Sequence, residues 1–355
     1  MKESEVMKKK VVVGMSGGVD SSVAAVLLQN EGYEVIGITF KFTDDFDPID
    51  ASLVCKKLNI EHHVIDYRKE FKEKVIDKFL EDYKRGITPN PCVMCNRYVK
   101  LNFLYEQMKK FNCNYMATGH YAKVIDKKIY KSKDENKDQT YFLCEMKKEQ
   151  LDSILFPLEG IDKSYVRKIA LDNNLITATK KDSTDVCFIN NTFKEYISSN
   201  IKDNKGDVVD IVTKEKKGTH NGLFHYTIGQ RRGLNIGGNT DRMFVVGKDN
   251  LKNILYVAVG SDTSYLTSTS CILENANLFD NDFDNNNLTA KFRYRQKEVP
   301  VSIKLLDNNE LLVNYKEEVK MVTLGQVCAI YDDMRLIGGG VIKEVRKDNK
   351  KLWYL

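Results

Sequence analysis

A glycine-rich loop near the start of the chain lies directly between an apolar run and a helix-like segment. The apolar run Val11–Val13 has the character of a buried strand, and the helical pattern after the loop continues to Glu31, where Gly32 stops it. Glycines let the backbone approach a ligand closely. A helix N-terminus offers free N–H groups and the positive end of its dipole to an anion. The order strand, loop, helix therefore predicts a phosphate site in an α/β domain.

The loop, SGGVDSS, has no lysine of the Walker type and no GxGxxG spacing. An ordinary capped turn, with Asp20 or Ser21 as the N-cap, is the simpler alternative. The loop resembles the PP-loop of the ATP pyrophosphatases, which cleave ATP to AMP and pyrophosphate. The resemblance implies ATP as ligand, with Asp20 near the phosphates through Mg²⁺. The residues expected at ATP are Gly14, Met15, Ser16, Gly17, Gly18, Val19, Asp20 and Ser21.

The first half of the chain alternates strand and helix patterns. Strands are expected at Val35–Phe40, His63–Asp66 and Tyr115–Thr118, with helices around Ala51–Leu58 and Glu70–Lys84. This rhythm predicts an α/β fold with a doubly wound parallel sheet. Ligands bind at the carboxyl edge of such sheets, so Phe40 and Gly119, which end two strands, are added to the ATP site.

The pattern changes after about residue 200 to short alternating runs. Strands are expected at Phe244–Val246, Tyr256–Val259, Leu288–Tyr294, Val299–Leu305, Leu311–Tyr315, Val327–Tyr331 and Gly338–Lys343, with a short strand at the end. The alternation predicts a small all-β barrel or sandwich at the C-terminus. The segment Asp280–Asn287 is expected to be a turn within it.

The composition of the chain restricts its class and location only loosely. The chain has 355 residues, is 42% hydrophobic and carries a formal net charge of +5, which permits a polyanionic partner without requiring one. The N-terminal segment lacks a signal-peptide core, and no stretch of 18 or more apolar residues occurs. The expected location is the cytoplasm, with no membrane partner.

The chain has eight cysteines, and two sequence contexts among them indicate reactive thiols. Cys92 and Cys95 lie on a proline-bounded turn, expected at the start of a helix over 100–108, where a helix N-terminus would lower the thiol pKa. Cys187 follows a polar turn and is expected to enter an apolar strand. Zinc on Cys92, Cys95, Cys113 and His120 is an alternative, but no second tight ligand pair occurs. The four cysteines expected to be buried and inert are Cys55, Cys144, Cys271 and Cys328.

Four basic residues alternate near residue 294. On a strand, Lys291, Arg293, Arg295 and Lys297 would share one face and form a stripe suited to a phosphate backbone. A solvated strand face is the alternative. Arg231 and Arg232 form a second basic turn.

A resemblance covers essentially the whole chain. The blocks SGGVDSS, PNPCVMCNRYVK, ATGHYA, KDQTYFL, KDSTDVCFI, HYTIGQRRGL, RYRQ and a final GQ…GGGVI are similar, in content and order, to those of the tRNA-specific 2-thiouridylase family. The resemblance implies that ATP adenylates O2 of the wobble uridine, U34, of the lysine, glutamate and glutamine tRNAs. Cys187 would carry a persulfide sulfur. Cys95 would act with it and close a Cys95–Cys187 disulfide.

The same resemblance implies contacts with RNA and with a sulfur donor. The target base would meet Asn90, Pro91 and Cys92. The tRNA contacts would be His120, Lys137, Asp138, Gln139, Arg293, Tyr294, Arg295 and Gln326. A satisfied loop histidine is the simpler interpretation of His120. The donor would be a cysteine desulfurase or a sulfur carrier protein.

One departure keeps alternatives open, because many family members have Asp where this chain has Cys92. Cys92, Cys95 and Cys187 could then hold a [4Fe–4S] cluster with one open iron. Two other hypotheses are an amidating or ligating PP-loop synthetase and a catalytically idle RNA-binding protein. The expected domains are a PP-loop catalytic domain over 1–205, a central connector over 206–273 and a β-barrel that grips tRNA over 274–355.

Overall fold

The computed structural model describes residues 8–182, 186–234, 243–260 and 262–355. The chain divides into two compact units. Unit 1 contains the residues up to 75, residues 92–188 and residues 334–337, and unit 2 contains residues 76–91, 189–333 and 338–355. Within the described parts, no helix combines the length and the apolar character that crossing a bilayer requires.

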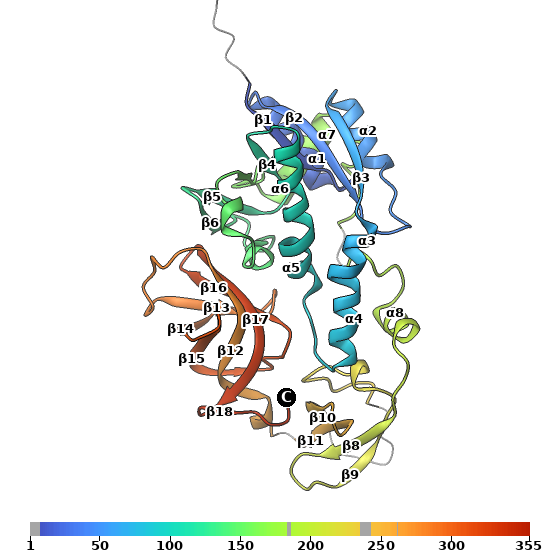
Figure 1. The fold of residues 1–355 in the computed structure, drawn as a ribbon, viewed down its shortest axis with the longest axis vertical. Helices are drawn as coiled ribbons and strands as arrows, with labels where there is room; N and C mark the ends of the chain where they lie inside the picture. The colour runs from blue at the N-terminus through green and yellow to red at the C-terminus, as the bar shows by residue number, and fades with distance from the viewer. Residues whose placement is uncertain (1–7, 183–185, 235–242, 261) are drawn as a thin grey trace, which may run out of the picture. The chain divides into compact units, whose positions relative to one another are not determined.

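Unit 1 is built on a five-stranded sheet in the order β3-β2-β1-β4-β7, and all its pairings are parallel (Figure 1). Its strands are β1 (Lys10–Gly14), β2 (Glu34–Lys41), β3 (Glu61–Asp66), β4 (Tyr115–Ala117) and β7 (Ile154–Leu155). The central strand β1 is apolar throughout its middle because both of its faces are covered. The predicted parallel sheet is confirmed.

Helices cover both faces of this sheet. On one face, α1 (Val19–Asn30), α2 (Ile49–Lys57) and α7 (Lys163–Asp172) share a core with Val11 and Val13. On the other face, α6 (Leu101–Lys110) packs against β1 and β4. A Cβ added at Gly14 would lie 3.6 Å from Leu104 of α6, which places that helix opposite the α1 face. The domain is therefore doubly wound.

The remaining elements of unit 1 include the helical run that carries Cys92 and Cys95. The segments α5 (Pro91–Cys95), η2 (Asn96–Lys100) and α6 form one continuous run, in which η2 is a π-helical turn (Figure 1). The smaller elements are α3 (Arg68–Phe71), η1 (Lys72–Ile76), β5 (Ala122–Ile125), β6 (Lys128–Lys131), η3 (Thr140–Leu143) and η4 (Lys148–Gln150).

Unit 2 begins with two short helices, α4 (Asp77–Lys84) and α8 (Phe193–Asn200), whose rings Tyr83 and Phe193 are 5.3 Å apart. A four-stranded sheet follows in the order β10-β11-β8-β9. Its elements are β8 (Gly206–Asp210), β9 (Lys216–His220), η5 (Leu223–His225), β10 (Met243–Asp249) and β11 (Ile254–Val259).

The last part of unit 2 is a closed antiparallel barrel. The strand order is β12-β15-β14-β13-β16-β17, and β17 pairs with β12 to close it. The pairing of β17 with β12 removes the two open edges that these six strands would otherwise have. The elements are η6 (Ser264–Leu266), β12 (Thr267–Leu278), β13 (Leu288–Lys291), β14 (Val299–Leu305), β15 (Leu311–Lys320), β16 (Val327–Asp332), β17 (Arg335–Lys347) and β18 (Lys350–Lys351). The predicted C-terminal barrel is confirmed.

Two local predictions are wrong. The strand expected to reach Tyr294 ends at Lys291, because the chain turns there: the Phe292 backbone N–H donates to Gln296 Oε1 at 3.2 Å, and Phe292 is buried. The four basic residues therefore do not share a strand face. At Cys187 the chain forms a turn and not the expected strand, and Ser183–Asp185 lie outside the described residues.

Candidate functional site

The glycine-rich loop joins β1 to α1 and leaves the helix start without a side-chain cap. The N-cap is Gly18, with an extended backbone and no side-chain hydrogen bond. Neither Asp20 nor Ser21 caps the helix, so the capped-turn alternative is not what the chain adopts. The first-turn N–H groups of α1 are thereby left for an external anion.

Hydrogen bonds inside the loop fix its shape. Ser21 Oγ accepts from the Ser16 backbone N–H at 3.2 Å and donates to the Gly18 carbonyl at 3.1 Å. Ser22 Oγ donates to the same carbonyl at 2.8 Å. Ser21 and Ser22 are buried, whereas Ser16 is exposed. The hydroxyl available to a ligand is therefore that of Ser16.

Two glycines of the site are required by their surroundings. Gly17 has φ +73°, and its carbonyl accepts from Lys180 Nζ at 2.9 Å. A Cβ at Gly119 would lie 2.7 Å from the backbone of Asp20 and Ser21. Gly119 was expected to open the backbone to adenosine. The structure shows that it lets its turn pack against the start of α1, and its contact with ATP stays a prediction.

A network of charges surrounds Asp20. Lys163 Nζ, on α7, donates to Asp20 Oδ1 at 2.7 Å and Oδ2 at 2.8 Å, and the Tyr121 hydroxyl donates to Oδ1 at 2.8 Å. Lys163 also pairs with Asp182 at 2.9 Å. Lys163 was missed from the sequence, because nothing local to an exposed-looking helical lysine indicates two carboxylate partners.

Asp182 forms ion pairs with three cationic side chains. Besides Lys163, it pairs with Lys137 at 3.1 Å and Arg167 at 2.8 Å. Burial opposes ionisation of Asp182, but the hydrogen bonds from Lys163 and Lys137 outweigh it and lower its pKa. The first residue of the segment that leads to Cys187 is thus an ionised anchor, five positions before the thiol.

Phe40 is the residue before the last of β2, and its ring lies in an aromatic cluster. Its ring stacks on Phe42 at 5.6 Å and meets Tyr67 edge-on at 5.5 Å. Phe42 stacks on Phe71, which meets Phe188 edge-on at 5.8 Å. Because the Phe40 ring packs against other aromatic rings, a contact of this residue with ATP would come from its backbone. The same cluster anchors Phe188, the neighbour of Cys187.

Cys92 and Cys95 lie three residues apart in the short helix α5, which begins at Pro91. Proline suits this first helical position because its missing N–H has no partner there in any case. Burial raises the pKa of Cys92 to about 11 and of Cys95 to about 12, although Cys92 keeps exposed surface. The expected lowering of the thiol pKa by the helix N-terminus is therefore wrong, because desolvation outweighs it.

Cys187 lies within electrostatic reach of both thiols. After burial, the largest influence that raises the pKa of Cys92 and Cys95 is the charge of Cys187. Burial also raises the pKa of Cys187 itself, and its side chain keeps exposed surface. The Cys187 charge thus acts on Cys92 and Cys95, and direct contact between their sulfur atoms stays a prediction.

Lys100 is the cation that these thiols share. Its charge lowers the pKa of Cys92, Cys95 and Cys187, against the larger effect of burial. Lys100 is the last residue of η2, and the i→i+5 spacing of a π turn brings it round toward the side of Cys95. Asn96 holds this turn by donating to the Phe142 carbonyl at 2.9 Å.

Comparisons with known proteins identify relatives that match nearly the whole chain. Residues 9–191 match the tRNA methyl transferase HUP domain, 194–259 the tRNA methyl transferase PRC-barrel domain and 268–342 the aminomethyltransferase beta-barrel domain. The tRNA-specific 2-thiouridylase MnmA of Mycoplasmopsis synoviae is 43% identical over 98% of this chain and 99% of its own length. The chain belongs to the tRNA-specific 2-thiouridylase family. The MnmA of Oceanobacillus iheyensis is likewise 43% identical, over 98% of each chain.

His120, one of the predicted tRNA contacts, makes its contacts inside the protein. His120 is buried, and its Nδ1 and Thr118 Oγ1 are 2.8 Å apart. Burial, with a further contribution from Lys100, lowers its pKa well below the usual range, so the ring is neutral. The simpler reading, a satisfied loop histidine, describes what the structure shows.

The expected tRNA segment 137–139 is also engaged within unit 1. Lys137 pairs with Asp182, and Asp138 is buried, accepting from the Ser132 backbone N–H at 3.0 Å. Gln139 Oε1 accepts from the Tyr121 backbone N–H at 3.0 Å. These contacts order the segment, and a role in tRNA binding stays a prediction.

The barrel residues expected at tRNA differ in exposure. Arg293 Nη2 donates to the Met321 carbonyl at 2.7 Å and to Thr323 Oγ1 at 2.8 Å, so it braces the barrel. Arg295 and Lys297 are exposed, and Tyr294 is half-buried. Arg295 is the predicted tRNA contact that remains open to a phosphate.

The arrangement of the cysteine side chains bears on the metal-site alternatives. Across the described residues, which include Cys92, Cys95, Cys187 and His120, no three His, Cys, Asp or Glu side chains gather closely enough to hold a metal ion. The three thiols therefore do not fit a preformed iron–sulfur site in this structure, and the zinc alternative gains no support.

Proposed function

We propose that this chain uses ATP to convert U34 of the lysine, glutamate and glutamine tRNAs to 2-thiouridine. O2 of the uridine would attack the α-phosphorus of ATP, forming an O–P bond as the bond to pyrophosphate breaks. The chain's membership of the 2-thiouridylase family and its uncapped phosphate loop support this step. Asp20 would hold the Mg²⁺ that accompanies ATP, and the ion would neutralise phosphate charge.

The cysteines would carry out the second step. The terminal sulfur of a Cys187 persulfide attacks C2, the C2–S bond forms, and AMP leaves with O2. Cys95 Sγ then attacks Cys187 Sγ, and the electron pair of the broken S–S bond passes to the transferred sulfur. The products are 2-thiouridine and a Cys95–Cys187 disulfide, which a cellular thiol reduces.

One observation carries this assignment: Cys187 lies within electrostatic reach of Cys95, although 92 positions separate them in the chain. Two thiols that exchange a sulfur must come into contact, and the influence of the Cys187 charge on Cys95 supports such an approach. The raised pKa of Cys95 means that it is a thiol at neutral pH. It must lose a proton before it attacks, and the nearby Lys100 charge favours the thiolate.

Asn90, Pro91 and Cys92 are proposed to face the target base, and Arg295 to contact tRNA. A cysteine desulfurase or a sulfur carrier protein would load Cys187. We keep the division into a catalytic domain to about residue 205, a connector to about 273 and a tRNA-binding barrel.

The decisive assay supplies unmodified lysine tRNA transcript, ATP, Mg²⁺ and a sulfide source, with nucleoside mass spectrometry. Thiouridine at position 34 with wild type, and none with Cys187→Ser, is the expected result. Full activity of Cys187→Ser would favour an amidating or ligating synthetase. Binding of tRNA without AMP release would indicate an idle RNA-binding protein. Iron and acid-labile sulfide in anaerobically purified protein would favour the cluster route.

A further inference from the structure

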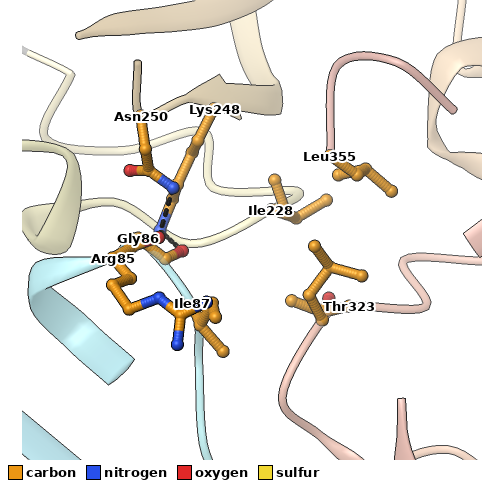
Figure 2. Close-up of a pocket in the computed structure, with 9 residues that line it drawn as sticks. Arg85, Gly86, Ile87, Ile228, Lys248, Asn250, Thr323 and Leu355 are labelled. Carbon is orange, nitrogen blue, oxygen red and sulfur yellow. Dashed lines mark hydrogen bonds between the residues drawn. The ribbon is translucent and has the colours of Figure 1, made fainter. Parts of the chain in front are cut away.

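The segment between α4 and α5, residues 85–89, is held at its backbone by side chains of the middle sheet. Lys248 Nζ donates to the Gly86 carbonyl at 3.0 Å, and Asn250 Nδ2 donates to the Arg85 carbonyl (Figure 2). Lys248 is only 8% exposed, and the Gly86 bond engages its amine. Burying a lysine amine against one carbonyl costs desolvation free energy. We name residues 85–89 the strap.

The C-terminal barrel holds the same strap from its β15–β16 connection. The Thr88 backbone N–H donates to the Leu324 carbonyl at 3.2 Å, and Gln326 Nε2 donates to the Thr88 carbonyl at 2.8 Å and to that of Pro89 at 3.4 Å. A Cβ at Gly325 would lie 2.1 Å from Ile87, so only glycine permits this approach.

The strap leads into the proposed target-base residues by a short, stiff path. Cys92 follows Pro89 by three residues, a span of at most about 10 Å. Pro89 and Pro91 have fixed φ angles, and each restricts the residue before it. A shift of the Thr88 and Pro89 carbonyls should therefore displace Asn90, the residue that follows them.

We propose that Lys248 and Gln326 are positioning residues for thiolation, which hold the strap so that Asn90, Pro91 and Cys92 lie where the uridine reacts. This inference rests on the target-base role proposed above for those three residues. The family resemblance implies that Gln326 contacts tRNA, and this inference gives it a different role. The two carbonyls that accept from the Gln326 amide, those of Thr88 and Pro89, both lie in the strap. The two β domains thereby take part in the chemistry as well as in binding.

Gln326→Glu tests this directly, because it keeps the size of the side chain and removes the donor. A carboxylate would face two carbonyl oxygens and push the strap away. We expect kcat for thiolation to fall at least tenfold, while the Kd for tRNA stays within twofold. The alkylation rate of Cys92 by iodoacetamide, followed by mass spectrometry without ATP or tRNA, should change at least threefold.

The matched control is Gln29→Glu, since Gln29 Nε2 donates to the Leu58 carbonyl at 3.0 Å at the far end of α1. It should behave as wild type. Lys248→Met, checked for folding by circular dichroism, is the second variant and should show the same fall in kcat with unchanged Kd.

The outcomes separate the two ideas. A tenfold rise in Kd with unchanged kcat in Gln326→Glu would make Gln326 a tRNA contact and overturn the inference. Wild-type kcat, Kd and alkylation in both variants would also overturn it. If wild type itself forms no thiouridine, the proposed function fails, whereas the alkylation rates still report whether the strap positions Cys92.

Discussion

Lys163 Nζ bonds to both carboxylate oxygens of Asp20, at 2.7 and 2.8 Å, and so places a cation at the first turn of α1. The same amine reaches Asp182. A cation beside the uncapped helix start is placed to meet the charge that ATP brings. It would also stabilise the charge that develops on the departing pyrophosphate.

Lys163→Met should reduce AMP release by at least about 100-fold, the usual cost of removing one such electrostatic donor. The free energy of unfolding should fall by about 2 kcal/mol. It should not fall further, because the side chains of Asp20 and Asp182 are 31% and 30% exposed. AMP release in single turnover and chemical denaturation measure the two effects.

Lys168→Met is the control for Lys163→Met, because Lys168 is an exposed lysine of the same helix. It should leave both quantities unchanged. Equal AMP release from Lys163→Met and wild type would remove Lys163 from the nucleotide chemistry.

The sequence sufficed for the parts of the fold that local pattern determines. The strand Val11–Val13, its loop and the following helix were all predicted, because an apolar run, glycines and a helical period succeed one another within 20 residues or so. The cysteine pair was found because prolines and a polar turn marked its two contexts. Lys163, Asp182 and Lys100 were not found as site residues, since each becomes significant only through partners distant in sequence.

The basic stripe shows how a correct pattern can mislead. Charged and apolar residues do alternate after Lys291, as on a strand. However, Gln296 caps the Phe292 N–H and Arg293 reaches the Met321 carbonyl, so side chains satisfy the backbone in a turn. The alternation of residue types along the sequence does not reveal such tertiary hydrogen bonds.

Arg295→Ala should weaken tRNA binding and reduce the slope of log K against log salt by about one, because an exposed arginine can neutralise one phosphate. Arg293→Ala should instead lower the melting temperature, because it removes two hydrogen bonds within the barrel. Filter binding at several salt concentrations and thermal unfolding separate the two. An unchanged salt slope in Arg295→Ala would take that residue out of the interface.

The thiols should react faster as the pH rises well beyond 9. Since the pKa of Cys95 is about 12, the thiolate fraction and the alkylation rate should increase roughly tenfold per pH unit from pH 7 to 10. Lys100→Met removes a cation that favours the thiolate, so the rate at pH 8 should fall several-fold. Lys110→Met, exposed in the same helical run, should match wild type. A plateau near pH 8 would show that the thiols are not buried as described.

Lys248 should make stability depend on pH in a defined direction. Burial lowers the pKa of its amine from 10.5 to about 7. Between these values the unfolded chain binds a proton that the folded chain lacks, so the free energy of unfolding rises with pH. The lowered pKa is therefore a cost to the folded chain, absent above pH 10.5 and growing as the pH falls toward 7.

Lys248→Met removes this dependence. The free energy of unfolding of wild type, relative to the variant, should therefore increase by about 2 kcal/mol from pH 7 to pH 9. Urea denaturation at three pH values measures it, and the exposed Lys252→Met supplies the control, with no change expected. A difference that stays constant with pH would mean that the Lys248 amine keeps its proton in the folded chain. The Gly86 carbonyl would then be held by a buried charge and not by a neutral amine.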